Sequence, residues 1–511
     1  MFFSRGIEYY SKNLERNINE LNNGNINVIP WIFCVFAESS KQHKLIAAKA
    51  LNEVLKELDF FSICKIDREM RQTTSMEWSI DWRRLKVENF LTNKMSNYEK
   101  RAVIIFSSFN PNGYIREKAV KLLLNFQNTL PYITLRKNDW VLQVRQAAHL
   151  AFCKRIEEAE DMELLRTLPF LEKLRRSSGD AYVELSEIIY KKMSSPLGQE
   201  VIKKGSKSNE IYTRKMCFNI LFEMKLPINP WVIEHLKRER DPFLRKMIFI
   251  KLVEGKTDIS EISRQFLNDK YGAIRVMALQ YIYDNRKEIV LQEAKRMLLD
   301  KNPYVRELAR KIIKELCPSI NIYKFYIDNL STNTQCAILG LGEIGSIEDC
   351  SIIEPYLYID NVSIVRASMI TLMRLNSEKY KTTITEMLLS VNKSILKTAT
   401  VLIEKYSVEN FERIFEIYER TNYENNKIKC VKLLFRASKW QRLIYMLITI
   451  KSEYDSVKLL SIKGIDSWIM SFNSSFTRPT NKERLTIIKL INEEKSILDV
   501  RVKNQLLFLS R

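Results

Sequence analysis

The stretches DKYGAIR at residues 269–275 and DKNPYVR at residues 300–306 decide the fold of this chain. Each begins with Asp, passes through a short turn, and ends on a β-branched residue followed by Arg. A small residue follows three positions after the Arg, as Ala278 and Ala309. Because a turn with the same order of residue types returns at a fixed interval, the sequence predicts a structural repeat.

The basic position of this motif keeps a period of about thirty residues over most of the chain. It falls at 214, 245, 275, 306 and 366, with intervals of 31, 30, 31 and 60 residues, so that the last interval is two periods. The series extends to the same motif at positions 116 and 145, and to weaker slots at 184, 336, 397, 429 and 458. These twelve slots span about 340 residues, and they predict about twelve repeated units.

Each period holds two helical patterns. Residues 305, 308, 309, 312 and 313 are apolar at the spacing of one helix face, and a second apolar pattern at 289–299 leads into the next turn. A hairpin of two short helices cannot bury its apolar face alone, so neighbouring hairpins must stack. The chain has only 12 Gly and 12 Pro in 511 residues, whereas strands joined by tight turns need many. The sequence therefore predicts an all-α fold, an α-solenoid (superhelix) of about 12 helical hairpins.

The turn Asp, the Val-Arg pair and the following Ala resemble HEAT repeats over roughly residues 100 to 470. Residues 337–345 (AILGLGEIG) resemble the HEAT-like variant found in phycobilisome-lyase-type repeats. In the HEAT family the equivalent Arg bonds the turn Asp of a neighbouring repeat, so the resemblance implies a structural ladder along the stack. It assigns this role to Arg116, Arg145, Arg245, Asp269, Arg275, Asp300, Arg306, Asp360 and Arg366. Such repeats serve scaffolds, adaptors, transport receptors and some nucleic-acid enzymes, so the resemblance selects no single function.

We expect three segments along the chain. Residues 1–98 are interpreted as a helical N-terminal cap or divergent repeats, 99–471 as the HEAT-like repeat array, and 472–511 as a loop followed by C-terminal capping helices. A second loop is expected at 194–209. The longest apolar runs, 28–37 and 443–450, are far shorter than the roughly 20 residues of a spanning helix. The N-terminus also lacks a signal peptide, so we expect a cytoplasmic protein with no transmembrane segment.

Catalytic and metal-binding chemistry is sparse in the sequence. Metal sites and nucleophilic triads usually need His beside Cys, Asp or Glu at fixed spacing, and we expect no such role for His43, His149 or His235. His149 is most simply a residue of a repeat helix. None of the eight cysteines forms a Cys-x-x-Cys pair, which favours buried thiols in a reducing compartment. The glycines of 340–345 follow no predicted strand, so they are not a phosphate loop. We therefore expect no catalytic residue, metal site, cofactor or small-molecule substrate.

The charge leaves two interpretations open. The net charge is +21, which favours polyanionic partners, although accumulation of Lys on solvated helix faces explains such an excess equally well. Residues 100–155 hold ten Lys and Arg against two acids, interleaved with aromatic residues. Basic side chains beside aromatic rings can neutralise phosphates and stack on bases. The candidate polyanion-binding residues are Arg83, Arg84, Lys118, Lys121, Arg136, Lys137, Trp140, Lys154 and Arg155.

The expected concave face argues for a different partner. If the Val-Arg helix lines that face, as in HEAT solenoids, the residue after each basic slot is exposed there. That row is Glu117, Gln146, Lys215, Lys246, Val276, Glu307 and Ala367, which is mixed in charge. We therefore expect a non-enzymatic scaffold or adaptor that binds a protein partner on the concave face.

The alternatives are a nucleic-acid-binding protein that uses the basic N-terminal third, and attachment to a membrane surface. A remote case is an enzyme similar to the HEAT-like alkylpurine DNA glycosylases. Asp139 and Trp140 are the one pair that suggests this reaction.

Overall fold

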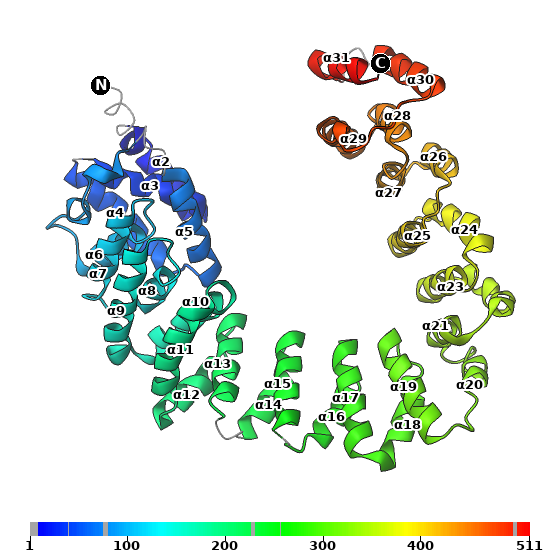
Figure 1. Ribbon diagram of the computed structural model, residues 1–511, viewed down its shortest axis with the longest axis horizontal. Coiled ribbons are helices and arrows are strands. Elements are labelled where there is room, and N and C mark those ends of the chain that lie inside the picture. Colours follow the sequence, from blue (N-terminus) through cyan, green and yellow to red (C-terminus); the bar gives the residue numbers. More distant parts are fainter. Residues whose placement is uncertain are drawn as a thin grey trace. The chain divides into compact units, whose positions relative to one another are not determined.

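The computed structural model describes residues 9–38, 40–74, 80–225, 230–255, 257–493 and 498–510. The described residues form α-helices and short 3-10 helices and no strand, which confirms the predicted all-α class. The chain divides into two units, Met1–Asp258 and Ile259–Arg511, and each is described by itself (Figure 1). The predicted segment boundaries after residues 98 and 471 stay predictions.

The first unit consists of helices joined by short turns. Short 3-10 helices lie at Ile26–Val28, Val35–Ala37, Trp82–Arg84 and Val87–Phe90. The α-helices are α2 (Leu14–Asn22), α3 (Ile29–Cys34), α4 (Lys41–Leu55), α5 (Phe60–Thr74), α6 (Asn97–Ser107), α7 (Gly113–Leu123), α8 (Leu130–Arg136), α9 (Leu142–Glu158), α10 (Asp161–Ser177), α11 (Gly179–Met193), α12 (Pro196–Gly205), α13 (Ile211–Glu223), α14 (Pro230–Arg238) and α15 (Pro242–Glu254).

The second unit has the same construction. Its 3-10 helices lie at Ile347–Asp349, Glu354–Leu357, Met387–Leu389 and Phe472–Ser474. The α-helices are α16 (Ser260–Phe266), α17 (Gly272–Asn285), α18 (Lys287–Met297), α19 (Pro303–Leu316), α20 (Ile322–Asp328), α21 (Thr334–Ile344), α22 (Cys350–Ile353), α23 (Val362–Leu375), α24 (Ser377–Glu386), α25 (Lys393–Lys405), α26 (Phe411–Arg420), α27 (Glu424–Leu434), α28 (Lys439–Thr449), α29 (Asp455–Met470), α30 (Asn481–Glu493) and α31 (Val500–Leu509).

All twelve slots of the sequence period lie in the second helix of a hairpin. These second helices are α7, α9, α11, α13 and α15 in the first unit and α17, α19, α21, α23, α25, α27 and α29 in the second. In the second unit each of them packs against the next, and each also packs against the first helix of its own hairpin. Helices α23, α25 and α27 form one row in Figure 1, beside a row that contains α24 and α26. This arrangement is the predicted α-solenoid of HEAT-like hairpins.

Side chains of the turns explain why a second helix starts where it does. The Oδ1 atom of Asn302 accepts hydrogen bonds from the backbone N–H groups of Tyr304 and Val305, at 3.0 and 3.4 Å, and so caps α19. Asn112, Asn361 and Asn392 cap α7, α23 and α25 in the same way. Such caps satisfy backbone donors that have no partner within the helix.

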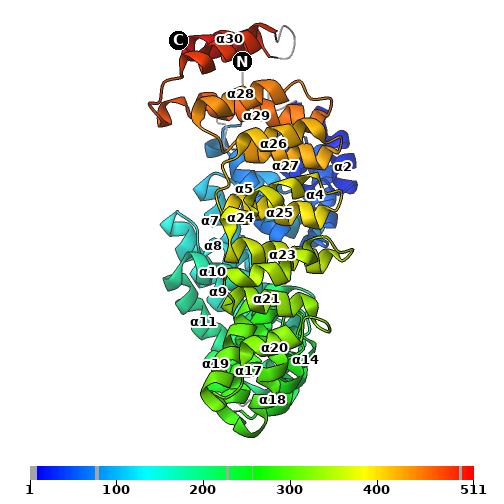
Figure 2. The same ribbon diagram turned by 90° about the vertical axis from the view of Figure 1, so that its right-hand side faces the viewer.

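Packing follows the apolar period of the sequence. Val305, Ala309, Ile312 and Ile313 of α19 are all buried. Seen from the side, the hairpins of the second unit follow one another in chain order, from the hairpin of α18 and α19 to the hairpin of α28 and α29, with α30 beyond it (Figure 2). The stack is regular in the second unit, whereas in the first unit α10 packs against both α8 and α13. That irregularity lies where the sequence interval between slots lengthens, from position 145 to 184.

The flanks and loops differ in part from the expectation. The loop expected at 194–209 is wrong, because α12 occupies most of it. Pro196 is at the first position of α12, and Ser195 caps it by accepting from the N–H of Gly198 at 3.1 Å. Proline at that position begins a helix. Irregular backbone does follow Ser474, as expected, up to α30.

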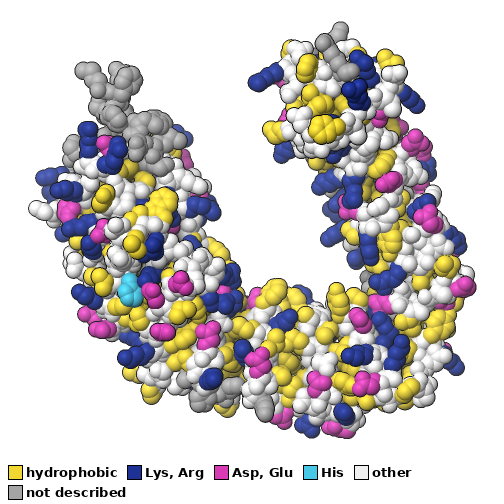
Figure 3. Space-filling model, in the orientation of Figure 1, with side chains coloured by type: hydrophobic (Ala, Val, Ile, Leu, Met, Phe, Trp, Pro, Cys, Tyr) yellow, Lys and Arg dark blue, Asp and Glu magenta, His cyan; other side chains and the backbone are white. Residues whose placement is uncertain are grey.

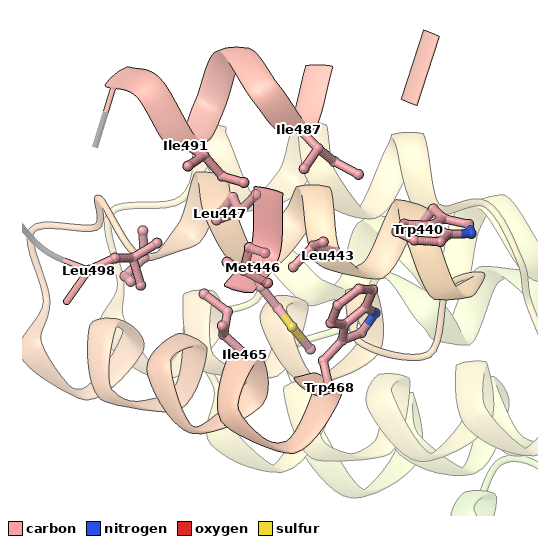
Figure 4. Packing of buried hydrophobic residues seen from close by; sticks show 11 residues of the cluster. Trp440, Leu443, Met446, Leu447, Ile465, Trp468, Ile487, Ile491 and Leu498 are labelled. Atoms are coloured by element: carbon pink, nitrogen blue, oxygen red, sulfur yellow. The ribbon is translucent and has the colours of Figure 1, made fainter. Parts of the chain in front are cut away.

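The last two helices complete an apolar core. Ile487 and Ile491 of α30 pack against a cluster that contains Leu447 of α28 and Trp468 of α29 (Figure 4). Leu506 of α31 belongs to the same cluster and is fully buried. Among the described residues, no helix is both long and apolar enough to cross a membrane.

Candidate functional site

An arginine of the first repeats joins two hairpins. The guanidinium of Arg116 in α7 donates to both carboxylate oxygens of Asp139, at 2.8 and 2.7 Å, and both side chains are buried completely. Its third nitrogen donates to the carbonyl oxygens of Asn110 and Pro111, at 2.9 and 2.8 Å. We call such a bidentate contact from a slot arginine to an acid of the next hairpin a rung.

Arg275 and Arg214 form rungs of the same geometry. Arg275 donates to the carboxylate of Asp300 at 2.7 and 2.6 Å, and to the carbonyl oxygen of Asp269 at 2.6 Å. Arg214 of α13 uses Glu239, at 3.0 and 2.9 Å. Bidentate contacts between guanidinium and carboxylate are among the stronger hydrogen-bonded pairs. The arginines are thereby occupied within the protein.

Two of the expected rungs have other partners. Arg306 pairs with Glu343 of α21 because the next turn, residues 331–333, carries no acid. The expected rung at Arg366 is wrong: its Nε donates to the hydroxyl of Thr398 at 2.8 Å, and Asp360 is exposed outside any rung.

Two further slot arginines also donate to backbone carbonyl oxygens of the preceding turn. Arg145 donates to the carbonyl oxygens of Asp139 and Trp140, at 2.7 and 3.0 Å. Arg245 donates to the carbonyl oxygen of Glu239 at 2.8 Å. Both contacts close the turn that precedes the helix of the arginine.

Three of the candidate polyanion-binding residues are buried, which corrects the expectation for them. Arg136 is 1% exposed and pairs with Asp67 and Asp139. Arg155 is 4% exposed and pairs with Glu163 at 2.7 Å. Lys137 is 8% exposed and pairs with an acid of α11. A buried cation requires an internal partner, so these three side chains are not available to a phosphate backbone.

Four further candidates are exposed but paired. Arg83 and Arg84 both contact Asp81 at 3.1 Å. Lys118 contacts Glu88 at 3.0 Å, and Lys121 contacts Glu117 at 2.6 Å. A count of charge within residues 100–155 misses most partners of its cations, because Asp67, Glu88, Glu163 and Glu184 lie outside that window. The structure therefore compensates much of the charge that the sequence places there.

Lys154 and Trp140 complete the candidates. Lys154 is exposed. Trp140 is 69% exposed, and its ring lies 5.9 Å from the guanidinium of Arg71 and 5.4 Å from that of Arg116. The neighbouring Asp139 is not available as a catalytic base. Burial raises the pKa of this carboxyl, but hydrogen bonds from Arg116 and the charge of Arg136 outweigh burial and hold the pKa below its usual range.

The exposed face of two second helices contains a hollow. A hollow of about 790 Å³ lies on α17 and α19, and we call it the α17–α19 groove. Tyr304 is 69% exposed at this groove, beside half-buried Val276 and Leu308. Lys311 and Lys314 are exposed along the same lining. Protein-binding surfaces typically combine aromatic and aliphatic side chains at the centre with polar side chains at the rim.

The predicted row of exposed residues holds in part. Gln146, Lys246 and Glu307 are exposed, and Glu117, Lys215 and Val276 are half-buried. The expectation is wrong for Ala367, which is 2% exposed. Figure 3 shows acidic side chains among the basic ones over the visible face of the molecule. Sequence reasoning missed Tyr304, Lys311 and Lys314, although Tyr304 stands in the repeat motif itself.

Titratable side chains outside the rungs form small local groups. His149 Nε2 lies 3.7 Å from Cys153 Sγ, and its Nδ1 lies 3.5 Å from Glu184. His235 Nε2 lies 2.8 Å from Glu239. In the part of the chain that the structure describes, no group of three or more His, Cys, Asp or Glu side chains could hold a metal ion.

Comparison with known proteins adds distant structural neighbours. No protein-family model and no curated sequence matches this chain. Among solved structures, a crystal structure of a Kap121p mutant has 11% identity and a TM-score of 0.34, over 98% of this chain and 68% of that one. Yeast importin-beta (Kap95p) has 11% identity and a TM-score of 0.29, over 97% and 64%. Importin beta in an ammonium sulfate condition has 11% identity and a TM-score of 0.30, over 94% and 74%.

The class of the protein follows from its own geometry. Among the described residues, twelve hairpins carry a slot residue in the second helix, and rungs join slot arginines to the next hairpin. These features define a HEAT-like α-solenoid.

Proposed function

We propose that this chain is a non-enzymatic scaffold or adaptor that binds a protein partner on the exposed face of its second helices. The observation that carries the proposal is the α17–α19 groove with Tyr304 exposed at its edge. Exposed aromatic rings beside aliphatic side chains are enriched at the centres of protein interfaces. A stack of hairpins also offers an extended surface, which suits a long or flat partner.

The mixed charge of this face supports a protein partner over a nucleic acid. A nucleic-acid track requires many cations that are free to neutralise phosphates. In the basic N-terminal third, by contrast, Arg116, Arg136 and Arg155 are buried in ion pairs. Glu307 and Glu315 lie beside Lys311 and Lys314 of the α17–α19 groove and offset their charge, so this groove offers phosphates little net attraction.

An affinity pull-down from the native host tests the proposal. The eluate is divided, and one half is treated with nuclease. We expect a defined protein that stays bound in both halves and whose yield falls in a Tyr304→Ala chain. Tyr358→Ala is the matched control, because Tyr358 is also 69% exposed but lies outside the α17–α19 groove. Recovery of nucleic acid, or of proteins that are lost after nuclease treatment, would overturn the proposal and favour the basic N-terminal third.

A further inference from the structure

A second hollow of the first unit has more cations than acids in its lining. It measures about 570 Å³ and lies among α12, α13 and α14. Five Lys and Arg side chains and two Glu side chains line it, together with His235 and Trp231. We call it the α12–α14 pocket.

The inner wall of this pocket is already satisfied. Glu239 is 3% exposed and accepts hydrogen bonds from Arg214 at 3.0 and 2.9 Å and lies 2.8 Å from His235. Arg214 also donates to the carbonyl oxygen of Ser208 at 2.9 Å. The second acid, Glu234, pairs with a lysine outside the lining at 2.9 Å. Glu239 is therefore engaged within the wall, and Glu234, which also feels the charge of Arg238, offsets only part of the positive charge of the rim.

The rim of the pocket carries the excess positive charge. Lys207, Arg238 and Arg240 are exposed, and no side-chain hydrogen bond or ion pair with the described residues engages them. Lys203 adds a fourth cation, whose ion-pair contact with Glu200 is long, at 3.7 Å. Cations that surround one hollow repel one another, and an anion that enters it relieves this repulsion.

The inner wall also supplies an apolar surface. Trp231 is half-buried, and its ring packs 5.9 Å from the ring of Phe218. The indole thus borders the cations without being fully covered. A ligand that combines several negative charges with aliphatic chain matches both parts of the lining.

We propose that the α12–α14 pocket binds an acidic segment of the protein partner, with three or more carboxylates in a short stretch. This inference rests on the proposed function, since it takes the partner to be a protein. Charge complementarity selects this occupant, because three exposed cations line one hollow: Lys207 after α12, Arg238 at the end of α14, and Arg240 just beyond it. A nucleic acid would need a continuous line of free cations, and the cations of the N-terminal third are largely paired.

Binding of synthetic probes to the purified full chain tests this site. The probes are hexaglutamate, hexaglutamine, inorganic tripolyphosphate and a short oligothymidylate, each with the same fluorescent label where it can carry one. We expect hexaglutamate to bind, hexaglutamine to fail, and the affinity for hexaglutamate to fall as NaCl rises. Replacing Lys207, Arg238 and Arg240 by Gln should weaken the binding of hexaglutamate about tenfold. Each exposed ion pair contributes little free energy, but the contributions of three positions add.

A matched control separates a site from bulk charge. Lys154, Arg166 and Lys191 are exposed cations of the same unit outside the α12–α14 pocket, and their replacement by Gln removes the same charge. We expect that triple variant to bind hexaglutamate as the unmodified chain does. Equal weakening by both triple variants, or tighter binding of tripolyphosphate or oligothymidylate than of hexaglutamate, would overturn the inference.

The two proposals fail separately in these experiments. If hexaglutamate does not bind while the pull-down partner still depends on Tyr304, only the pocket assignment is wrong. If nuclease removes the pull-down partner, the proposed function fails whatever the peptide does.

Discussion

Replacement of Arg116 by Met tests what a rung contributes to stability. Arg116 makes two hydrogen bonds to Asp139 and two to backbone carbonyl oxygens, and its side chain is fully buried. Removing one partner of a buried ion pair costs about 3–5 kcal/mol. Asp139 retains Arg136 at 3.2 Å and the N–H of Val141 at 3.0 Å, so the loss should lie at the lower end. We expect the local free energy of opening to fall by about 3 kcal/mol.

Hydrogen exchange read by mass spectrometry is the suitable assay, because a repeat array need not unfold in one step. A loss of about 3 kcal/mol should speed exchange of the α7 and α9 amides roughly 100-fold. Lys121→Met is the control, since the Lys121–Glu117 pair is exposed and such pairs contribute about 0–1 kcal/mol. Equal exchange in the two variants would refute the reasoning that the rungs stabilise the array.

Three further predictions concern packing, pH and thiol access. Gly340→Ala should destabilise the second unit by about 1–3 kcal/mol in urea denaturation, because an added Cβ would overlap the ring of Tyr326. Gly179→Ala is the control, since an added Cβ there meets open space. Equal midpoints of urea unfolding in the two variants would contradict this prediction. Burial raises the pKa of Glu239, but hydrogen bonds from His235 and Arg214 outweigh it and lower that pKa to about 2. In the unfolded chain the pKa of Glu is about 4.3. The stabilisation by the Glu239 carboxylate is therefore fully present above about pH 5, and it is lost as the pH falls toward about 2. Acid unfolding should show that loss, and Glu239→Gln should remove it; an unchanged profile would contradict the assignment. Iodoacetamide should alkylate half-buried Cys153 and Cys317 before buried Cys217, as peptide mass spectra would show, and equal rates would contradict the burial.

The thirty-residue period and the residue types of the turns made the helical hairpins predictable from the sequence. Every slot from position 116 to 458 falls in a second helix, because the apolar period and the capping asparagines act locally in sequence. The segment 194–209 is a case where local composition predicts a loop and the chain forms a helix. Its Ser-Pro and Gly residues are typical of loops, yet Pro196 and Ser195 begin α12 instead.

The candidate site was harder to predict, because charges compensate one another across the fold rather than along the chain. Arg136 meets Asp67, 69 residues away, and Arg155 meets Glu163 across the turn between α9 and α10. Tyr304 and Lys311 belong to the same helix, but the α17–α19 groove also needs Val276 of the preceding hairpin. A sequence shows such residues only as members of separate repeats, so their convergence requires the stacked structure.

The most direct test of the central claim is a lysine footprint of the chain with and without its captured partner. An amine-reactive label is applied to both samples, and the modified peptides are quantified by mass spectrometry. If the partner covers the face of the second helices, Lys311 and Lys314 lose most of their reactivity, whereas Lys118, Lys121 and Lys154 keep theirs. Unchanged Lys311 and Lys314, with protection at Lys118, Lys121 and Lys154, would contradict the proposed scaffold surface.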